Sequence, residues 1–158
     1  MSVQVMFVCL GNICRSPTAH GVFQKLVEDA GLAQQVSVES SGTAAWHVGK
    51  SPDRRSVAAA GERGYDLSQL VARQVCTGDF EQYDYVLAMD RSNLQDLEDI
   101  APPGYRGHLG LFLSFGQQQS YLEVPDPYYG DGKGFELVLD LVEDAANGLL
   151  NHIKRRHL

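Results

Sequence analysis

The sequence predicts an α/β domain built on a mainly parallel β-sheet. Strand-like apolar segments alternate with segments of helical periodicity along the chain, which is the pattern of successive β-α-β units. The first strand-like segment, residues 3–9, is apolar on nearly every residue, as expected for a strand that is covered on both faces. The length of 158 residues suits one domain, which we expect to span residues 1–158.

The first half of the chain is predicted to hold two strands and two helices. Residues 3–9 form the first strand. Ser16 offers a capping hydroxyl and Pro17 suits the first helical position, so a helix is expected to begin there and to end at Gly31. A second strand is expected over residues 36–40, and a second helix over residues 53–64.

The second half continues the same alternation. We expect a third strand over residues 84–90, a helix over 91–100, a short fourth strand over 108–112, a Pro- and Gly-rich loop over 125–134 and a last helix over 135–156. The last helix ends in basic residues, which complement the negative end of its dipole. Parallel sheets of this kind bind ligands beyond the carboxyl ends of their strands.

The composition disfavours some classes of function. The net charge of -7 and the pI of about 5.1 would repel a nucleic acid. No apolar run approaches the length of a membrane span and no signal peptide is recognisable, so we expect no membrane association and a cytoplasmic location. The three cysteines, Cys9, Cys14 and Cys76, fit free thiols in a reducing compartment, and their spacing is not that of a zinc site.

The segment after the first strand has the composition of an anion-binding loop. It reads CLGNICRS over residues 9–16 and leads into a helix N-terminus. Main-chain N–H groups in such a loop and in the first helical turn lack internal partners, and the helix dipole favours negative charge there. Gly11 and Asn12 tolerate the positive φ that a tight curl requires. Arg15 adds a planar group that binds two oxygens at once.

Cys9 lies at the base of this loop and is the candidate nucleophile. A thiol near a helix N-terminus and an arginine is stabilised as a thiolate, and Ser16 can donate a hydrogen bond to it. The spacing C-x5-R is common by chance, and a cysteine at a strand end is more often a small buried residue. The strand before Cys9, the helix after it, and Gly11, Asn12 and Ser16 together favour attack on a bound phosphate.

Two motifs give this chain its resemblance to the low-molecular-weight protein tyrosine phosphatase family. They are VCLGNICRSP at residues 8–17 and DPYYG at residues 126–130. Shorter matches follow in the expected order: SPD at 51–53, ARQ at 72–74, DF at 79–80 and MDRSNL at 89–94. The resemblance covers nearly the whole chain. It implies a four-stranded parallel sheet with helices on both faces, of the doubly wound, flavodoxin-like type, and catalysis without a metal or other cofactor.

The resemblance also implies a role for each matching residue. Cys9 matches the nucleophile, Arg15 the phosphate-binding arginine and Asp126 the general acid. Cys14 matches a second loop cysteine, which in the family can form a reversible disulfide with the nucleophile. The implied substrate-binding residues are Leu10, Gly11, Asn12, Ile13, Cys14, Ser16, Trp46, Tyr128 and Tyr129.

Asn12 and Ser16 match residues that hold the loop in shape, and Ser40 is expected to contact Asn12. In one respect the chain departs from its relatives. Many of them have a histidine just before the ARQ segment that supports the loop asparagine, and here Leu70 stands at the nearest equivalent position. We therefore expect Asn12 to depend more on Ser16 and Ser40.

These residues predict hydrolysis of phosphotyrosine through a cysteinyl-phosphate intermediate. Alone, Asp126 between two prolines is more typical of a turn, but the resemblance makes it the acid that protonates the leaving phenolate. Trp46, Tyr128 and Tyr129 are expected to form walls for an aryl ring rather than ordinary loop packing. The expected partners are phosphotyrosine-containing proteins, with inorganic phosphate or other oxyanions in the loop, and the chain is expected to be a monomer or weak dimer.

Three other functions have to be weighed against this one. An arsenate reductase has a similar loop but needs further redox cysteines, and only Cys76 lies outside the loop. A protein-arginine phosphatase of similar fold tends to have threonine where Ile13 stands. A phosphate-binding module would need neither a nucleophile nor an acid. Ile13, the neighbouring tyrosines and Asp126 favour an enzyme that acts on an aromatic phosphoester.

Overall fold

The computed structural model describes residues 2–128 and 133–158. In chain order its elements are β1 (Val3–Cys9), α1 (Arg15–Asp29), β2 (Val36–Gly42), α2 (Arg54–Glu62), α3 (Asp79–Gln82), β3 (Tyr85–Ala88), α4 (Arg91–Ile100), β4 (His108–Leu111), the 3-10 helix η1 (Phe112–Phe115) and α5 (Lys133–His157).

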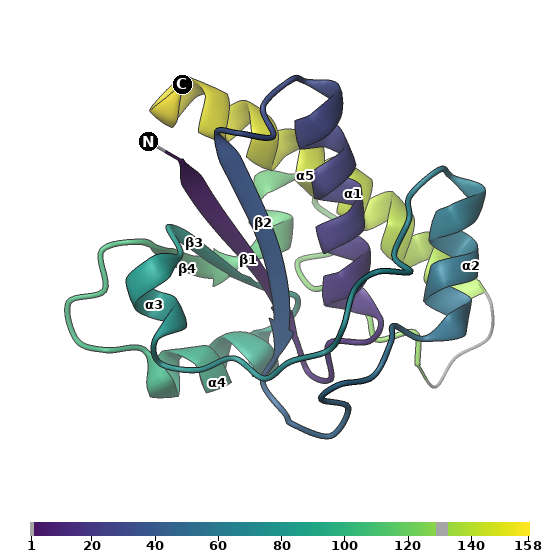
Figure 1. Cartoon of the computed structure of the whole chain (residues 1–158), viewed down its shortest axis with the longest axis horizontal. Coiled ribbons are helices and arrows are strands. Elements are labelled where there is room, and N and C mark those ends of the chain that lie inside the picture. Colours follow the sequence, from purple (N-terminus) through teal and green to yellow (C-terminus); the bar gives the residue numbers. More distant parts are fainter. Residues whose placement is uncertain (1, 129–132) are drawn as a thin grey trace.

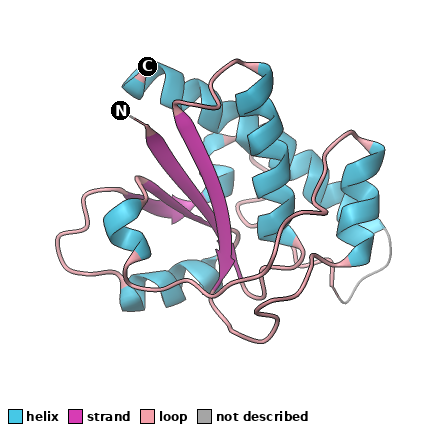
Figure 2. Ribbon diagram, viewed as in Figure 1, coloured by secondary structure: helices cyan, strands magenta, loops and turns pink. Residues whose placement is uncertain are grey.

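The four strands form one parallel sheet in the order β2-β1-β3-β4. Figure 1 shows α1 and α5 on one face of this sheet and α3 and α4 on the other, and Figure 2 shows that the loops run between these layers at both ends of the strands. The predicted four-stranded parallel sheet with helices on both faces is therefore confirmed.

The side chains of β1 alternate between two cores, one on each face of the sheet. Val5 and Phe7 pack with the apolar side of α1 and α5, whereas Met6 and Val8 pack with α3 and α4. This explains why β1 is apolar at nearly every position. The Phe7 ring is 4.8 Å from the Phe112 ring, measured between centroids. The central strand is thus held rigidly, and Cys9 is its last residue.

The first helix begins before Ser16, the residue that was predicted to cap it. The helix α1 begins at Arg15, after Cys14, and no side chain caps its N-terminus. Ser16 lies inside the first turn, where its hydroxyl oxygen accepts a hydrogen bond from Nδ2 of Asn12 at 2.8 Å. Ser16 does not cap the helix because it is already the second residue of the helix.

Other boundaries differ by a few residues. The strand β2 continues to Gly42, and β3 and β4 are shorter than predicted. The loop predicted over 125–134 ends earlier, because α5 already begins at Lys133. Neither α3 nor η1 was predicted, since a four-residue segment is too short to show helical periodicity.

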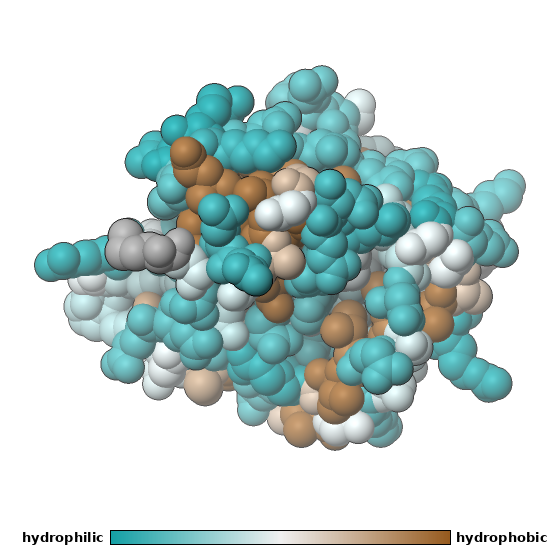
Figure 3. Space-filling model, turned by 45° about the horizontal axis from the view of Figure 1, so that its top comes forward, coloured by the Kyte–Doolittle hydropathy of each residue, from teal (hydrophilic) through white to brown (hydrophobic). Residues whose placement is uncertain are grey.

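One face of the molecule is largely hydrophilic, with apolar residues gathered in separate patches (Figure 3). Among the described residues, no helix combines the length and the apolar character that a membrane span requires. Because all four strands run in the same direction, Cys9 at the end of β1 and the residues after β3 lie at one edge of the sheet. The candidate active site is built at this edge.

Candidate active site

The loop between β1 and α1 curls tightly around a concave surface. Asn12 has a φ of 58°, a left-handed conformation that asparagine adopts more readily than most residues. Among residues 2–128 and 133–158, nothing accepts a hydrogen bond from the main-chain N–H groups of Gly11, Ile13 and Cys14. These donors, at the N-terminus of α1, suit an anion that accepts several hydrogen bonds at once.

Asn12 holds the curl through contacts on both sides. Its Nδ2 donates to the Ser16 hydroxyl, and its Oδ1 accepts a hydrogen bond of 3.1 Å from the main-chain N–H of Arg73. Arg73 is itself anchored, because its guanidinium forms two hydrogen bonds of 3.1 Å with the carboxylate of Asp79. Asn12 is 2% exposed, so loss of these contacts would leave buried polar groups without partners.

The expected contact between Ser40 and Asn12 is wrong. The Ser40 hydroxyl lies 2.9 Å from Nδ1 of His20, which comes from α1. Burial lowers the pKa of His20, and Glu39 nearby partly offsets this effect. Leu70 packs against the apolar core and offers no polar contact. The main-chain N–H of Arg73 therefore supports the loop asparagine in a chain that has no histidine at the Leu70 position.

Two glycines lie where the loop approaches its neighbours closely. A Cβ atom on Gly11 would lie 2.8 Å from Cδ2 of His47. A Cβ atom on Gly42, at the end of β2, would lie 2.7 Å from the carbonyl oxygen of Leu10. The clash at Gly42 is with main-chain atoms that cannot move aside, so glycine is needed there for the loop to pack against β2, whereas at Gly11 the His47 ring would have to shift.

The sulfur of Cys9 lies at the base of the loop, with two polar neighbours. It accepts a hydrogen bond of 3.3 Å from the main-chain N–H of Asn12, and the Ser16 hydroxyl is 3.1 Å away. The Ser16 hydroxyl also lies 3.3 Å from the carbonyl oxygen of Ser41, so its one proton can be directed to either neighbour. Cys14 differs in its environment: burial, followed by the charge of Asp53, raises the pKa of its thiol to about 12. Cys14 is therefore a neutral thiol at neutral pH, and no disulfide joins the described cysteines.

Arg15 is buried, and its guanidinium is held in place by two residues from distant parts of the chain. Its Nη1 donates to Oδ2 of Asp90 at 2.6 Å and to the carbonyl oxygen of Val124 at 3.1 Å. Burial alone would lower the pKa of Arg15, but the Cys9 sulfur and Asp90 outweigh it and raise that pKa above its usual value. Arg15 therefore keeps its charge, with the Nη2 side of the guanidinium directed toward Asp126 at 3.7 Å.

Asp126 lies on the loop that precedes α5 and faces Arg15. Its side chain is 34% exposed, and its Oδ1 accepts a hydrogen bond of 3.0 Å from the main-chain N–H of Tyr128. Arg55, in α2, donates to the carbonyl oxygen of Tyr128 at 3.0 Å and to both carboxylate oxygens of Asp53. Asp53 in turn donates its N–H to the carbonyl oxygen of Ile13 at 2.8 Å. Asp53 and Arg55 thus connect the loop of Cys9 to the loop of Asp126.

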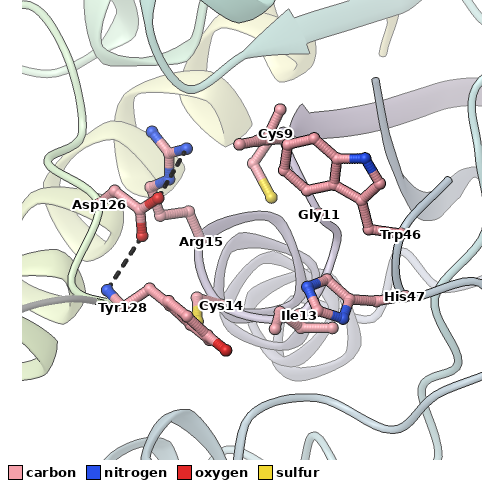
Figure 4. Close-up of a pocket in the computed structure, with 10 residues that line it drawn as sticks. Cys9, Gly11, Ile13, Cys14, Arg15, Trp46, His47, Asp126 and Tyr128 are labelled. Atoms are coloured by element: carbon pink, nitrogen blue, oxygen red, sulfur yellow. Dashed lines mark hydrogen bonds and ion pairs between the residues drawn. The ribbon is translucent and has the colours of Figure 1, made fainter. Parts of the chain in front are cut away.

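The side chains of Cys9, Arg15 and Asp126 line a single pocket, which Figure 4 shows in close-up. The Cys9 sulfur points into it, Asp126 and Tyr128 lie on one side, and Trp46 and His47 lie on the other. Trp46 is 69% exposed, so it forms an outer wall rather than part of the core. Of the predicted site residues, Leu10, Gly11, Ile13, Cys14 and Arg15 also line the pocket; Asn12 and Ser16 lie behind it, and Tyr129 falls outside the described residues.

The sequence analysis did not identify four residues of this site: His47, Arg55, Arg73 and Asp90. Asp90 had a usable signal, because an aspartate between a strand and a helix is a common N-cap, and its Oδ1 indeed accepts a hydrogen bond from the N–H of Asn93. Its second role, toward Arg15, depends on β3 being the neighbour of β1. The other three gave no signal in the sequence, because the contacts that tie them to the site are with distant residues: His47 and Arg55 with Tyr128, and Arg73 with Asn12.

Comparison with known proteins places this geometry in a family. A family model described as low molecular weight phosphotyrosine protein phosphatase matches residues 4–158. The low molecular weight phosphotyrosine protein phosphatase of Schizosaccharomyces pombe is 43% identical over 150 residues, which cover 94% of this chain and 96% of that protein.

Solved structures agree with this placement. A crystal structure of a protein tyrosine phosphatase from Entamoeba histolytica, with Hepes in its active site, is 38% identical to this chain and has a TM-score of 0.95, covering 99% of this chain and 100% of that one. A crystal structure of a Drosophila arginine phosphatase is 31% identical, with a TM-score of 0.90 and coverage of 96% and 98%.

The matches extend over nearly the whole chain and include both the loop of Cys9 and the loop of Asp126. Chains this similar over their full length share a fold and a common origin, so the chain belongs to the low molecular weight phosphotyrosine protein phosphatase family.

Proposed function

We propose that Cys9, Arg15 and Asp126 together hydrolyse phosphotyrosine in protein substrates. Membership of the family makes the chain a protein-tyrosine-phosphatase, a hydrolase of phosphoric monoesters. The assignment of roles rests on one observation: a sulfur, a guanidinium and a carboxylate from three parts of the chain converge on a single pocket.

The loop binds the phosphate group of the substrate. The N–H groups of Gly11, Ile13 and Cys14, with the guanidinium of Arg15, donate hydrogen bonds to its non-bridging oxygens. These donors are already fixed before the reaction, so they stabilise the charge of the transition state without reorganising. Inorganic phosphate and related oxyanions bind the same donors.

In the first step the thiolate of Cys9 attacks phosphorus, and the bond between phosphorus and the phenolic oxygen breaks. The carboxyl group of Asp126 gives its proton to that oxygen, because a phenolate, whose conjugate acid has a pKa of about 10, leaves poorly without one. The products of this step are a cysteinyl phosphate and a neutral tyrosine. The pocket walls formed by Trp46 and Tyr128 suit the aryl ring of the substrate.

In the second step water attacks the phosphorus of the cysteinyl phosphate. Asp126, now a carboxylate, takes a proton from the water, and the sulfur of Cys9 leaves as a thiolate. Inorganic phosphate is released and the enzyme returns to its starting state. The hydroxyl of Ser16, within 3.1 Å of the sulfur, favours this departure by stabilising the negative charge.

The similarity to an arginine phosphatase gives the alternative substrate class a specific basis. In this chain the apolar side chain of Ile13 lines the pocket, and aromatic rings flank it, which favours an aryl group over a guanidinium. An arsenate reductase is supported less, because Cys76 is exposed and does not line the pocket.

Turnover of matched peptides tests the proposed substrate. The purified protein, without added metal, is expected to release phosphate from a phosphotyrosine peptide at least about tenfold faster than from the same peptide with phosphoarginine, as judged by kcat/KM. Faster turnover of phosphoarginine would overturn the proposed substrate class but not the roles of Cys9 and Arg15. A thiol-dependent arsenate reduction assay with the same sample is expected to show no turnover.

Arg55 is expected to act as a positioning residue for Asp126, because it ties the acid loop to α2. The variant Arg55→Gln should lower kcat/KM about tenfold for aryl phosphates with poor leaving groups, which need the acid, and leave kcat/KM for good leaving groups nearly unaffected. The matched control is Arg54→Gln, since Arg54 is its exposed neighbour and lines no part of the pocket. Equal losses for both kinds of leaving group in Arg55→Gln would show that the residue supports the fold in general.

A further inference from the structure

A second pocket lies at the end of the sheet opposite the active site, where the strands begin. It has a volume of about 330 Å³ and is bounded by the starts of β3 and β4 and by the last turns of α5. In Figure 1 the C-terminal end of α5 lies near the start of β1, far from the carboxyl ends of the strands. The pocket, named here the distal basic pocket, is lined by Tyr85, Arg106, His108, His152, Arg156 and His157.

The distal basic pocket has an excess of positive charge that the rest of the protein does not share. The chain carries a net charge of -7, yet two arginines and three histidines line this pocket beside a single carboxylate, that of Asp84. The Asp84 carboxylate already accepts a hydrogen bond of 2.8 Å from the main-chain N–H of Gln4. Neither Arg106 nor Arg156 forms an ion pair with any described carboxylate.

The dipole of α5 explains only part of this arrangement. Basic residues in the last turn of a helix stabilise its negative end, which accounts for Arg156 and His157. It does not account for Arg106 and His108, which come from the loop before β4 and from β4 itself. Two separate segments therefore bring cationic groups to the same cavity.

The histidine rings are held in place around one buried tyrosine. The centroid of the Tyr85 ring is 5.7 Å from that of His108, 5.8 Å from that of His152 and 5.8 Å from that of His157. The Tyr85 hydroxyl is also 2.9 Å from Nε2 of His157. Phe115 packs against both His108 and His152. Groups that are already ordered lose little conformational entropy when a ligand binds them.

The electrostatics of the pocket favour an anion. Burial, followed by the charge of Arg156, lowers the pKa values of both His108 and His152 below the ordinary 6.5. Other cations add to the effect on His152, among them His108, Arg155 and His157. The groups that face these imidazoles are thus mostly positive, and a bound anion would relieve their mutual repulsion.

We propose that the distal basic pocket binds a small phosphate-type anion that carries two or more negative charges. Arg106 and Arg156 supply permanent charge and forked donors, which match phosphate oxygens. The imidazoles of His108 and His152 take up protons as the anion binds. The two arginines would repel a metal cation, and the described residues contain no group of three or more side chains placed to hold one.

This arrangement makes binding depend on pH in a defined direction. Without ligand, His108 and His152 are neutral near pH 7, because their pKa values are lowered. Binding of an anion raises those pKa values, so by linkage the affinity increases as the pH falls toward 6. A phosphate-type ligand itself loses negative charge over the same range, which works in the opposite direction. Tighter binding at lower pH therefore reports on the histidines of the protein.

The five histidines of the chain provide a direct test by NMR spectroscopy of their imidazole groups. His47 lines the active-site pocket and reports on binding there, whereas His108, His152 and His157 report on the distal basic pocket. Titration with inorganic pyrophosphate is expected to shift the three distal resonances with one saturable curve, tighter at about pH 6 than at about pH 8. Orthophosphate should shift the same resonances but bind the pocket more weakly, since it carries less charge.

Variants on the last turns of α5 make the test specific. The variant Arg156→Gln should weaken pyrophosphate binding to the distal basic pocket, measured from the three distal resonances, at least about tenfold, as expected for loss of a charge-assisted pair. Lys154→Gln removes the same charge from the same turn but does not line the pocket, so it should change the affinity by less than about twofold. Both variants should retain phosphotyrosine turnover and the response of His47.

Three results would contradict the proposal. They are distal resonances that stay unchanged while His47 responds, equal weakening by Lys154→Gln and Arg156→Gln, and pKa values of His108 and His152, read from the same resonances, that do not rise when pyrophosphate is bound. None of these results depends on catalysis, because His47 and turnover report separately on the active site.

Discussion

Replacement of Cys9 by serine is expected to lower kcat for a phosphotyrosine peptide by at least about 10⁴-fold, which is the scale expected when a covalent nucleophile is lost. A serine hydroxyl is a far weaker nucleophile than a thiolate, because it stays protonated at neutral pH. The substitution preserves the size of the side chain, and Cys9 is 2% exposed, so the loop should keep its shape. The phosphate release rate measures the effect.

The matched control for this prediction is Cys76→Ser, which replaces an exposed cysteine outside the pocket and should leave kcat unchanged. Cys9→Ser should still bind phosphate in the loop, since its N–H donors and Arg15 remain. Rapid quenching of the wild-type protein during turnover should trap phosphate on Cys9. Residual turnover within about tenfold of wild type, or a trapped phosphate on another residue, would refute Cys9 as the nucleophile.

Replacement of Asp126 by asparagine is expected to separate substrates by their leaving groups. For phenyl phosphate or a phosphotyrosine peptide, kcat/KM should fall by roughly 10²–10⁴-fold, the usual contribution of a general acid. For an aryl phosphate with a good leaving group the loss of kcat/KM should be much smaller, because that oxygen departs without a proton. The slope of log(kcat/KM) against the leaving-group pKa should therefore be steeper in the variant than in the wild type, while kcat also reports the loss of the base in the second step.

Asp96→Asn is the control for this second prediction, since Asp96 is exposed on α4 and does not line the pocket. It should change neither rate nor slope. Equal losses of kcat/KM for good and poor leaving groups in Asp126→Asn would show that the carboxylate acts through its contact with Arg15 at 3.7 Å rather than as an acid. Together with Arg55→Gln, the comparison separates the acid from the residue that positions its loop.

The part of the site that could be predicted is the part encoded in consecutive residues. Cys9 and Arg15 are six positions apart, and Gly11 and Asn12 between them have the backbone freedom that the curl needs. Short-range geometry of this kind depends little on the rest of the fold. The prediction for Ser16 was right about its contact with Asn12 and wrong about the helix cap, because α1 already begins at Arg15.

The support of Asn12 shows where prediction from local sequence stops. Ser40 was expected to contact Asn12, but His20 from α1 lies within hydrogen-bond distance of Ser40, and Arg73 supports the asparagine instead. Each candidate partner lies far from Asn12 or Ser40 in the chain. Which polar group reaches another inside a packed core depends on strand register and on the rotation of α1, and neither follows from residue type.

By itself, the sequence determined the alternation of strands and helices and the tight loop from Cys9 to Arg15, and its two motifs named the nucleophile, the arginine and the acid that we propose. Only the tertiary structure decided that Asp90 holds Arg15, that Arg55 links the two loops, and that Arg106 meets Arg156 in a second pocket. The physical reason is that periodicity and turn chemistry are local properties, whereas these contacts arise from the order β2-β1-β3-β4 and the packing of α5 across it.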